Sequence, residues 1–141
     1  MFTVEEARRL VPPLPGAKTK NLFLRDRKGL RHFLVVVGYG KAVDLKALTS
    51  LLGVSKLGFA SPARLQRYLG VSPGAVSIMG VVNDTNHEVE VIVDRDLWDA
   101  KAFQCHPLVN TSTLVISRDH LQRFLDATGH QVRLLHVPSR D

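Results

Sequence analysis

The 141-residue sequence lacks several features that mark particular classes of protein. Its single cysteine, Cys105, excludes an internal disulfide and a metal site built from cysteines alone. No apolar run approaches the roughly 20 residues that a membrane-spanning helix needs. The first residues also lack the basic segment followed by an apolar one that marks a secretory signal. We therefore expect one cytoplasmic domain over residues 1–141, with no membrane partner.

Familiar catalytic signatures are missing as well. The sequence has no G-x-S-x-G elbow, no Walker loop, no H-E-x-x-H and no G-x-G-x-x-G after a strand. The Cys105-His106 pair has no second pair at a spacing that would complete a zinc site, so we expect no metal and no cofactor. Four other histidines are expected at the surface or in turns: His32, His87, His120 and His130.

Positive charge is concentrated in the first half of the chain. The net charge is +6, and residues 1–70 hold 13 Lys/Arg against 4 Asp/Glu, whereas residues 71–141 hold 6 against 9. This asymmetry favours a basic face suited to a polyanion, although a basic solvated surface would give the same counts.

The hydrophobic pattern predicts strands joined by hairpins and interrupted by helices. Strands are expected over 20–26, 30–37, 57–60, 75–82, 89–93, 113–116 and 132–137, with 75–82 paired to 89–93. Helices are expected over 4–10, 45–52, 62–69 and 118–128, with a single turn capped by Asp94. This order predicts an α+β fold, a single domain with a mixed or largely antiparallel sheet and flanking helices.

Two polar segments could carry chemistry. In the segment Lys18-Thr19-Lys20-Asn21, a lysine at a strand mouth could hold a phosphate, and the asparagine offers both a donor and an acceptor. His106 precedes a proline and a run of small polar residues, an arrangement that could line a polar pocket. From these residues alone, solvated lysines and an ordinary loop remain the alternatives.

Several segments together resemble one family. Residues 18–29 resemble the T-K-N-L-F-L-x-D-x-K-G segment of the YbaK/ProX family, relatives of the editing domain inserted in bacterial prolyl-tRNA synthetase. Segments that agree in order and spacing are 44–48, 59–61, 69–74, 82–84, 106–111 and 124–130. The resemblance runs over nearly the whole chain and is greatest to the free-standing ProX-type members.

The resemblance implies a deacylase that removes alanine wrongly attached to proline tRNA. It makes Lys20 the functional lysine, which positions the terminal adenosine or its phosphate, and it places His106 at the aminoacyl end. The residues implied to border the substrate are Asn21, Leu22, Gly70, Val71, Ser72, Pro73, Gly74, Asn110, Thr111 and Ser112. Mischarged proline tRNA is the implied partner, and prolyl-tRNA synthetase is a further candidate.

The N-terminus departs from the family pattern. Family members usually carry an additional helix and strand before the segment that matches residues 2–6, and that strand limits which amino acid fits. We therefore expect the substrate choice to be open to serine or cysteine, and a bare sheet edge could favour a homodimer. The alternatives are a relative that binds tRNA without hydrolysis and a general nucleic-acid binder that uses the basic half alone.

Overall fold

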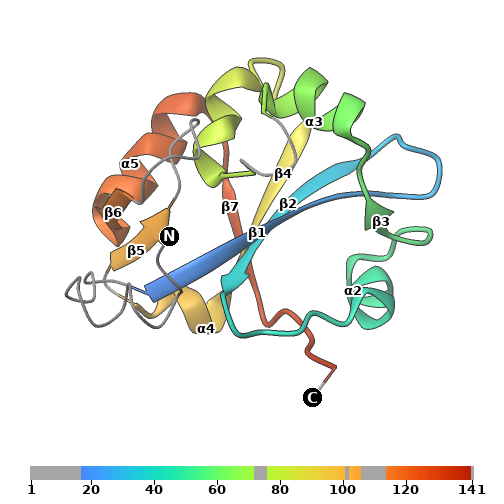
Figure 1. Cartoon of the computed structure of the whole chain (residues 1–141), viewed down its shortest axis with the longest axis horizontal. Coiled ribbons are helices and arrows are strands. Elements are labelled where there is room, and N and C mark those ends of the chain that lie inside the picture. The colour runs from blue at the N-terminus through green and yellow to red at the C-terminus, as the bar shows by residue number, and fades with distance from the viewer. Residues whose placement is uncertain (1–16, 72–75, 101, 106–113, 141) are drawn as a thin grey trace, which may run out of the picture.

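The computed structural model describes residues 17–71, 76–100, 102–105 and 114–140. This part of the chain forms one mixed sheet of order β6-β5-β1-β2-β4-β7, with β3 paired to β1 outside this path (Figure 1). The strands are β1 (Ala17–Arg25), β2 (His32–Gly38), β3 (Gly58–Phe59), β4 (Val89–Asp94), β5 (Ala102–Cys105), β6 (Leu114–Ser117) and β7 (Val132–Leu135). The helices are α2 (Leu45–Leu52), α3 (Pro62–Leu69), the 3₁₀ helix η2 (Ile78–Asn83), α4 (Arg95–Trp98) and α5 (Arg118–Thr128). None of these helices has the length and apolar character that crossing a membrane requires.

A buried carboxylate fixes the turn between β1 and β2. Asp26 Oδ1 accepts hydrogen bonds from the backbone amides of Leu30 at 2.8 Å and Arg31 at 3.2 Å. Burial alone would raise the pKa of Asp26, but hydrogen bonds from the amides of Arg31, Leu30 and Gly29 outweigh it and lower the pKa. The turn sets the antiparallel register, which runs from Arg25↔His32 to Thr19↔Gly38.

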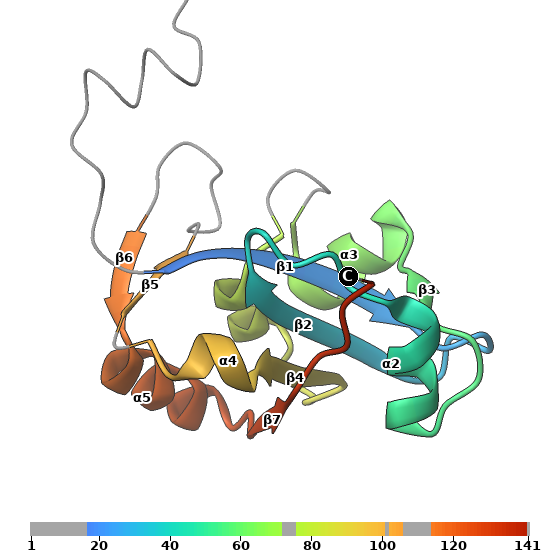
Figure 2. The ribbon, with the colours of Figure 1, turned by 90° about the horizontal axis from the view of Figure 1, so that it is seen from below.

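Strand β2 is the centre of the sheet. It pairs antiparallel with β1 and parallel with β4, and residues 32–37 are all buried. Its side chains alternate between two cores. Leu34 and Val36 pack in a cluster with residues of α3, η2 and α5. Phe33, Val35 and Val37 pack in a second cluster with residues of α2, on the other face of the sheet (Figures 1 and 2).

The three longer helices begin and end where the sequence predicts. In each case a capping side chain accepts a hydrogen bond from the amide three residues on, and a glycine in the left-handed conformation ends the helix. The capping residues are Asp44, Ser61 and Ser117, and the terminal glycines are Gly53, Gly70 and Gly129. The expected α+β class and mixed sheet are confirmed.

The strand predicted over residues 75–82 is wrong. Most of its described part lies in η2, which is capped by Ser77 and begins at Ile78, and the strand β4 pairs in parallel with β2 and β7 instead. The buried side chains Ile78 and Val81 are three residues apart, which is the period of a 3₁₀ helix. Strand β5 was not predicted, and the carboxylate of Asp94 does not cap α4 but binds Lys41 Nζ at 2.6 Å.

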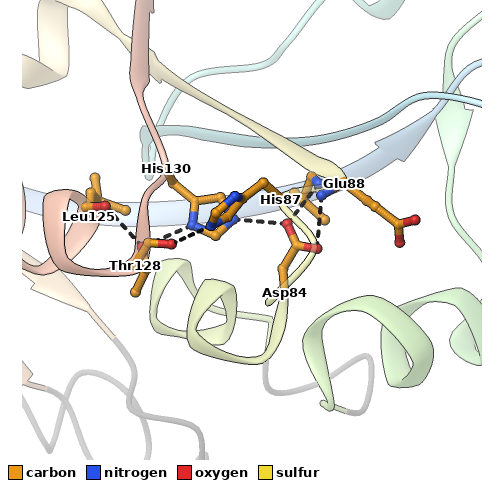
Figure 3. Close-up of polar contacts among 7 residues, drawn as sticks. Asp84, His87, Glu88, Leu125, Thr128 and His130 are labelled. Atoms are coloured by element: carbon orange, nitrogen blue, oxygen red, sulfur yellow. Dashed lines mark hydrogen bonds and ion pairs between the residues drawn. The ribbon is translucent and has the colours of Figure 1, made fainter.

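A buried polar network connects the segment after η2 to the end of α5 (Figure 3). Asp84 accepts hydrogen bonds from the amides of Glu88 and Val89, and its Oδ2 lies 2.9 Å from His130 Nε2. His130 Nδ1 lies 2.9 Å from Thr128 Oγ1. The side chains of Asp84 and His130 are each 2% exposed. The network therefore holds the start of β4 against the start of β7.

A second buried histidine lies between aromatic rings. His32 is 1% exposed and its ring lies 4.1 Å from the ring of Tyr68, measured between centroids. Arg64 Nη1 lies 3.0 Å from His32 Nε2. Because a guanidinium can only donate, this nitrogen accepts. Burial and then the charge of Arg64 lower the pKa of His32, so the ring is neutral in the folded protein at neutral pH.

We expect Asp84→Ala to lower the free energy of unfolding by about 3 kcal/mol, because the buried amide of Val89, the amide of Glu88 and the buried His130 lose their acceptor. Asp84→Asn keeps one acceptor oxygen and should cost less. Urea unfolding of both variants and the wild type measures the difference, and equal stability of all three would show that the network contributes nothing.

Acid should destabilise the protein through His32. The pKa of this ring is lowered in the folded state, so as pH falls below about 6.5 the unfolded chain binds a proton that the folded chain excludes. The free energy of unfolding should therefore fall between pH 7.5 and pH 5. Gln keeps an acceptor for Arg64, so His32→Gln should show a shallower fall when urea unfolding is repeated across this range. An unchanged slope would contradict the assignment.

Candidate functional site

Lys20 lies near the start of β1, on the face of the sheet that α2 covers. It pairs with Val37 of β2, whose side chain belongs to the core cluster on that face. The lysine is half-buried and makes no ion pair with any described residue. Its ammonium is therefore available to an anionic ligand.

The neighbours of Lys20 in sequence divide between the two faces of the sheet. Leu22 lies on the same face as Lys20, where it packs against the α2 cluster. Asn21 pairs with Val36, whose side chain belongs to the opposite cluster. The sequence predicts that all three border one pocket, but strand alternation allows this only if the pocket includes the edge of β1.

Among the described residues, no strand pairs with the outer edge of β1 between its two flanking strands. Strand β5 pairs with β1 at residues 17 and 18, and β3 pairs with it at residues 24 and 25. The carbonyl of Phe23 points to this edge, because it accepts from the amide of Ala60. Asn21 lies two residues earlier, so its backbone N–H and C=O face the same edge, where no described strand pairs with them.

Asn21 also carries a buried oxygen without a partner. Its Oδ1 is buried and accepts no hydrogen bond from the described residues. Buried polar atoms in folded proteins are almost always paired, because an unpaired one costs about 1–3 kcal/mol. An unpaired acceptor at an open strand edge is therefore a candidate contact for a ligand with a hydrogen-bond donor.

Two other expected residues have structural roles in this fold. Gly70 ends α3 with a φ of 67°, and an added Cβ would lie 2.8 Å from Asn83 Nδ2. Val71 is buried in the core cluster with α3 and η2. The buried Val71 side chain is not free to contact a substrate, and Gly70 has no side chain to offer.

The other expected site residues lie outside the described part of the chain. They are His106, Ser72, Pro73, Gly74, Asn110, Thr111 and Ser112. The described neighbour of His106 is Cys105, which ends β5. Strand β5 runs parallel to β1, and Thr19 Oγ1 donates to the carbonyl of Gln104 at 2.6 Å. The strand that leads to His106 thus ends beside the segment that contains Lys20.

Two of the four histidines expected at the surface are buried. His32 and His130 are 1% and 4% exposed, whereas His87 and His120 are exposed as predicted. The Asp84–His130 pair resembles a catalytic dyad in composition, but both side chains are buried and their polar atoms already bind partners within the network. The signal for this pair was present in the segments 82–84 and 124–130, yet sequence alone does not show that they meet.

Two carboxylates near the end of β4 and a histidine after β7 also have a structural explanation. Asp94, Asp96 and His136 lie close enough together to hold a cation. Lys41 Nζ lies 2.6 Å from Asp94 and 3.8 Å from Asp96, and it also donates to the carbonyl of Val137. The lysine already neutralises the buried carboxylate, so this group ties the β2–α2 connection to the C-terminal segment.

The described residues around Lys20 suit binding better than covalent catalysis. Thr19 carries the hydroxyl nearest in sequence, and this hydroxyl donates to a backbone carbonyl. No described histidine or carboxylate hydrogen-bonds to Thr19 or Lys20 to form a nucleophile–base pair. A cation, an unpaired amide oxygen and backbone groups that no described strand pairs with can hold and orient a polar, anionic ligand.

Comparisons with known proteins agree on one family. The sequence model of the aminoacyl-tRNA editing domain matches residues 1–124. The chain is 39% identical to the prolyl-tRNA editing protein ProX of Acetoanaerobium sticklandii over 137 residues, which is 97% of this chain and 84% of that protein. It is 38% identical to prolyl-tRNA synthetase associated domain-containing protein 1 of Danio rerio, over 92% of this chain and 71% of that protein.

Solved structures agree with this result. A proposed trans-editing enzyme for prolyl-tRNA synthetase aligns with a TM-score of 0.67 and 26% identity, over 94% of this chain and 78% of that one. A scaffold protein from epitope-grafting design aligns with a TM-score of 0.71 at 20% identity, over 99% of this chain and 82% of that one, and shows the fold alone. The sequence match over residues 1–124 and the shared fold establish that this chain belongs to the aminoacyl-tRNA editing domain family.

Proposed function

We propose that this protein is a trans-editing deacylase that hydrolyses the ester between a wrongly attached amino acid and the terminal ribose of tRNA, with alanine on proline tRNA as the substrate. The observation that carries the proposal is the unpaired Lys20 beside the open edge of β1. Family membership and the name of the ProX relative support it.

In this proposal Lys20 anchors the substrate. Its ammonium holds a phosphate near the terminal adenosine, and the free backbone groups of Asn21 orient the ribose or the aminoacyl group. The Oδ1 atom of Asn21 accepts a hydrogen bond from a substrate donor, either the α-ammonium group or a ribose hydroxyl. His106 serves the aminoacyl end, as the family resemblance implies.

The reaction needs no protein nucleophile, because an aminoacyl ester is already activated. Water, oriented by the free ribose hydroxyl, attacks the carbonyl carbon and forms a tetrahedral intermediate. The ester C–O bond then breaks, one proton of the attacking water passes to the ribose oxygen and the other to solvent, and the amino acid leaves with a free carboxylate. The aminoacyl pocket accepts alanine and excludes the larger proline ring by its size, as in a second-sieve editing site.

The partners follow from the reaction. Mischarged proline tRNA binds directly, and the reaction takes place in the cytoplasm, where tRNA is charged. Association with prolyl-tRNA synthetase and formation of a homodimer stay predictions. A deacylase for serine or cysteine and a tRNA-binding relative without hydrolysis are the alternatives that a direct assay separates.

The direct test is the rate of amino-acid release from alanyl-, prolyl- and seryl-tRNA, all on proline tRNA. We expect rapid release of alanine and no release of proline.

Lys20→Ala should reduce the rate at least a hundredfold with an unchanged unfolding temperature, because the half-buried lysine has no partner in the described fold. A Lys20→Ala variant with the wild-type rate would remove Lys20 from the site. Tight tRNA binding by the wild type without any release would favour the non-catalytic alternative.

Asn21→Leu separates a binding role from a structural role. Leu removes a buried acceptor that no described residue satisfies, so we expect the variant to be more stable by about 1 kcal/mol. The same change should slow alanine release at least tenfold, because the substrate loses its acceptor. Urea unfolding and the deacylation assay on the same preparation measure both effects. A variant that loses stability and activity together would mean that Asn21 supports the fold only.

A further inference from the structure

Basic side chains gather around a hollow at the hairpin end of β1. Arg25 from β1, Arg27 from the turn and Lys56 from the segment before β3 line this hollow together with Leu57 and Gly58. Its volume is about 440 Å³. Arg27 and Lys56 are exposed, so their charged groups face solvent. We call this surface the hairpin groove.

The charges of the hairpin groove have no acidic partner among the described residues. Arg25 Nη1 donates to the backbone carbonyl of Asp26, which is a neutral group. The carboxylate of Asp26 is 7% exposed and is occupied by backbone amides. Two other cations of the first half are neutralised, since Arg31 binds Glu90 and Lys41 binds Asp94. The groove therefore keeps an uncompensated positive potential.

The composition of the groove favours phosphates over a protein partner. Protein interfaces usually centre on buried apolar or aromatic anchors. The one apolar side chain that lines this groove, Leu57, is 4% exposed and belongs to the α2 core. Cationic side chains and backbone groups are the contacts that bind a nucleic-acid backbone without reading its sequence.

We propose that the hairpin groove binds the phosphates of the tRNA acceptor arm while the terminal adenosine occupies the site at Lys20. This inference rests on the proposed function, which supplies the RNA. Lys20 and Arg25 lie five residues apart on β1, a span of about 17 Å. A tRNA bound at both points contacts the protein through its terminal adenosine and through its backbone phosphates. These two contacts orient the ester at the edge of β1.

The test removes two exposed cations, in the double variant Arg27→Ala/Lys56→Ala. The matched control is Arg123→Ala/Arg133→Ala, which changes the charge equally on α5 and β7, where both residues are exposed. Binding of uncharged proline tRNA is measured between 50 and 300 mM salt. Alanine release is measured from alanyl-tRNA and from 3′-O-alanyl-adenosine, which lacks the acceptor arm.

We expect the groove variant to bind tRNA about tenfold more weakly and with a salt slope smaller by about 1–2, since two phosphate contacts are lost. Its KM for alanyl-tRNA should rise while kcat and the rate on alanyl-adenosine stay at wild-type values. The control should match the wild type throughout.

Three results would overturn the inference. The first is tRNA affinity of the groove variant equal to that of the control. The second is an equal loss on alanyl-adenosine, which would place the effect in the catalytic site. The third is a competition result in which polyglutamate displaces tRNA from the wild type as effectively as competitor RNA does. This result would mean that the groove binds an acidic protein. If the wild type binds tRNA but releases no amino acid, the proposed function fails. The binding measurements alone then decide whether the hairpin groove binds tRNA.

Discussion

The carboxylate of Asp26 controls where every functional side chain of β1 lies. Its hydrogen bonds to the amides of Leu30 and Arg31 close the turn, and the turn sets the pairing of β1 with β2. Because side chains alternate along a strand, a shift of one residue would exchange the two faces. Lys20 would then enter the core beneath α3 and η2, and Asn21 would face α2. The buried turn thus determines the site at the far end of the same strand.

The two faces of the sheet are held together by polar contacts as well as by apolar packing. On one side Asp84 and His130 connect the starts of β4 and β7. On the other, Lys41 binds Asp94 and the carbonyl of Val137, which fixes the C-terminal segment against the end of β4. Both contacts are far from Lys20 in sequence, and they stabilise β4 at its two ends. Strand β4 is thus anchored at both ends beside β2, whereas at the opposite edge of β1 no described strand pairs with the stretch between β5 and β3.

Local signals in the sequence predicted most of the fold. The caps at Asp44, Ser61 and Ser117 each bind an amide three residues on, and each terminal glycine directly follows its helix, so these signals can be read without the tertiary structure. The parallel pairing of β2 with β4 joins segments far apart in the chain and leaves no local signal. The 3₁₀ helix η2 has an apolar composition that a strand shares, and only its buried positions distinguish the two. The family resemblance of its segment singled out Lys20, but the division of Lys20 and Asn21 between the two faces required the register.

The burial of β2 on both faces has a consequence for synthesis and refolding. Its apolar run can pair with β1 as soon as the hairpin has emerged, because the two strands are neighbours in the chain. Its other edge must wait for β4, since His32 pairs with Val89. Until then a strand rich in valine presents unpaired amides and carbonyls, the arrangement from which intermolecular β-aggregates grow. Helix α3 can cover one face of the strand, where Tyr68 lies against the ring of His32, but only completion of β4 removes the exposed edge.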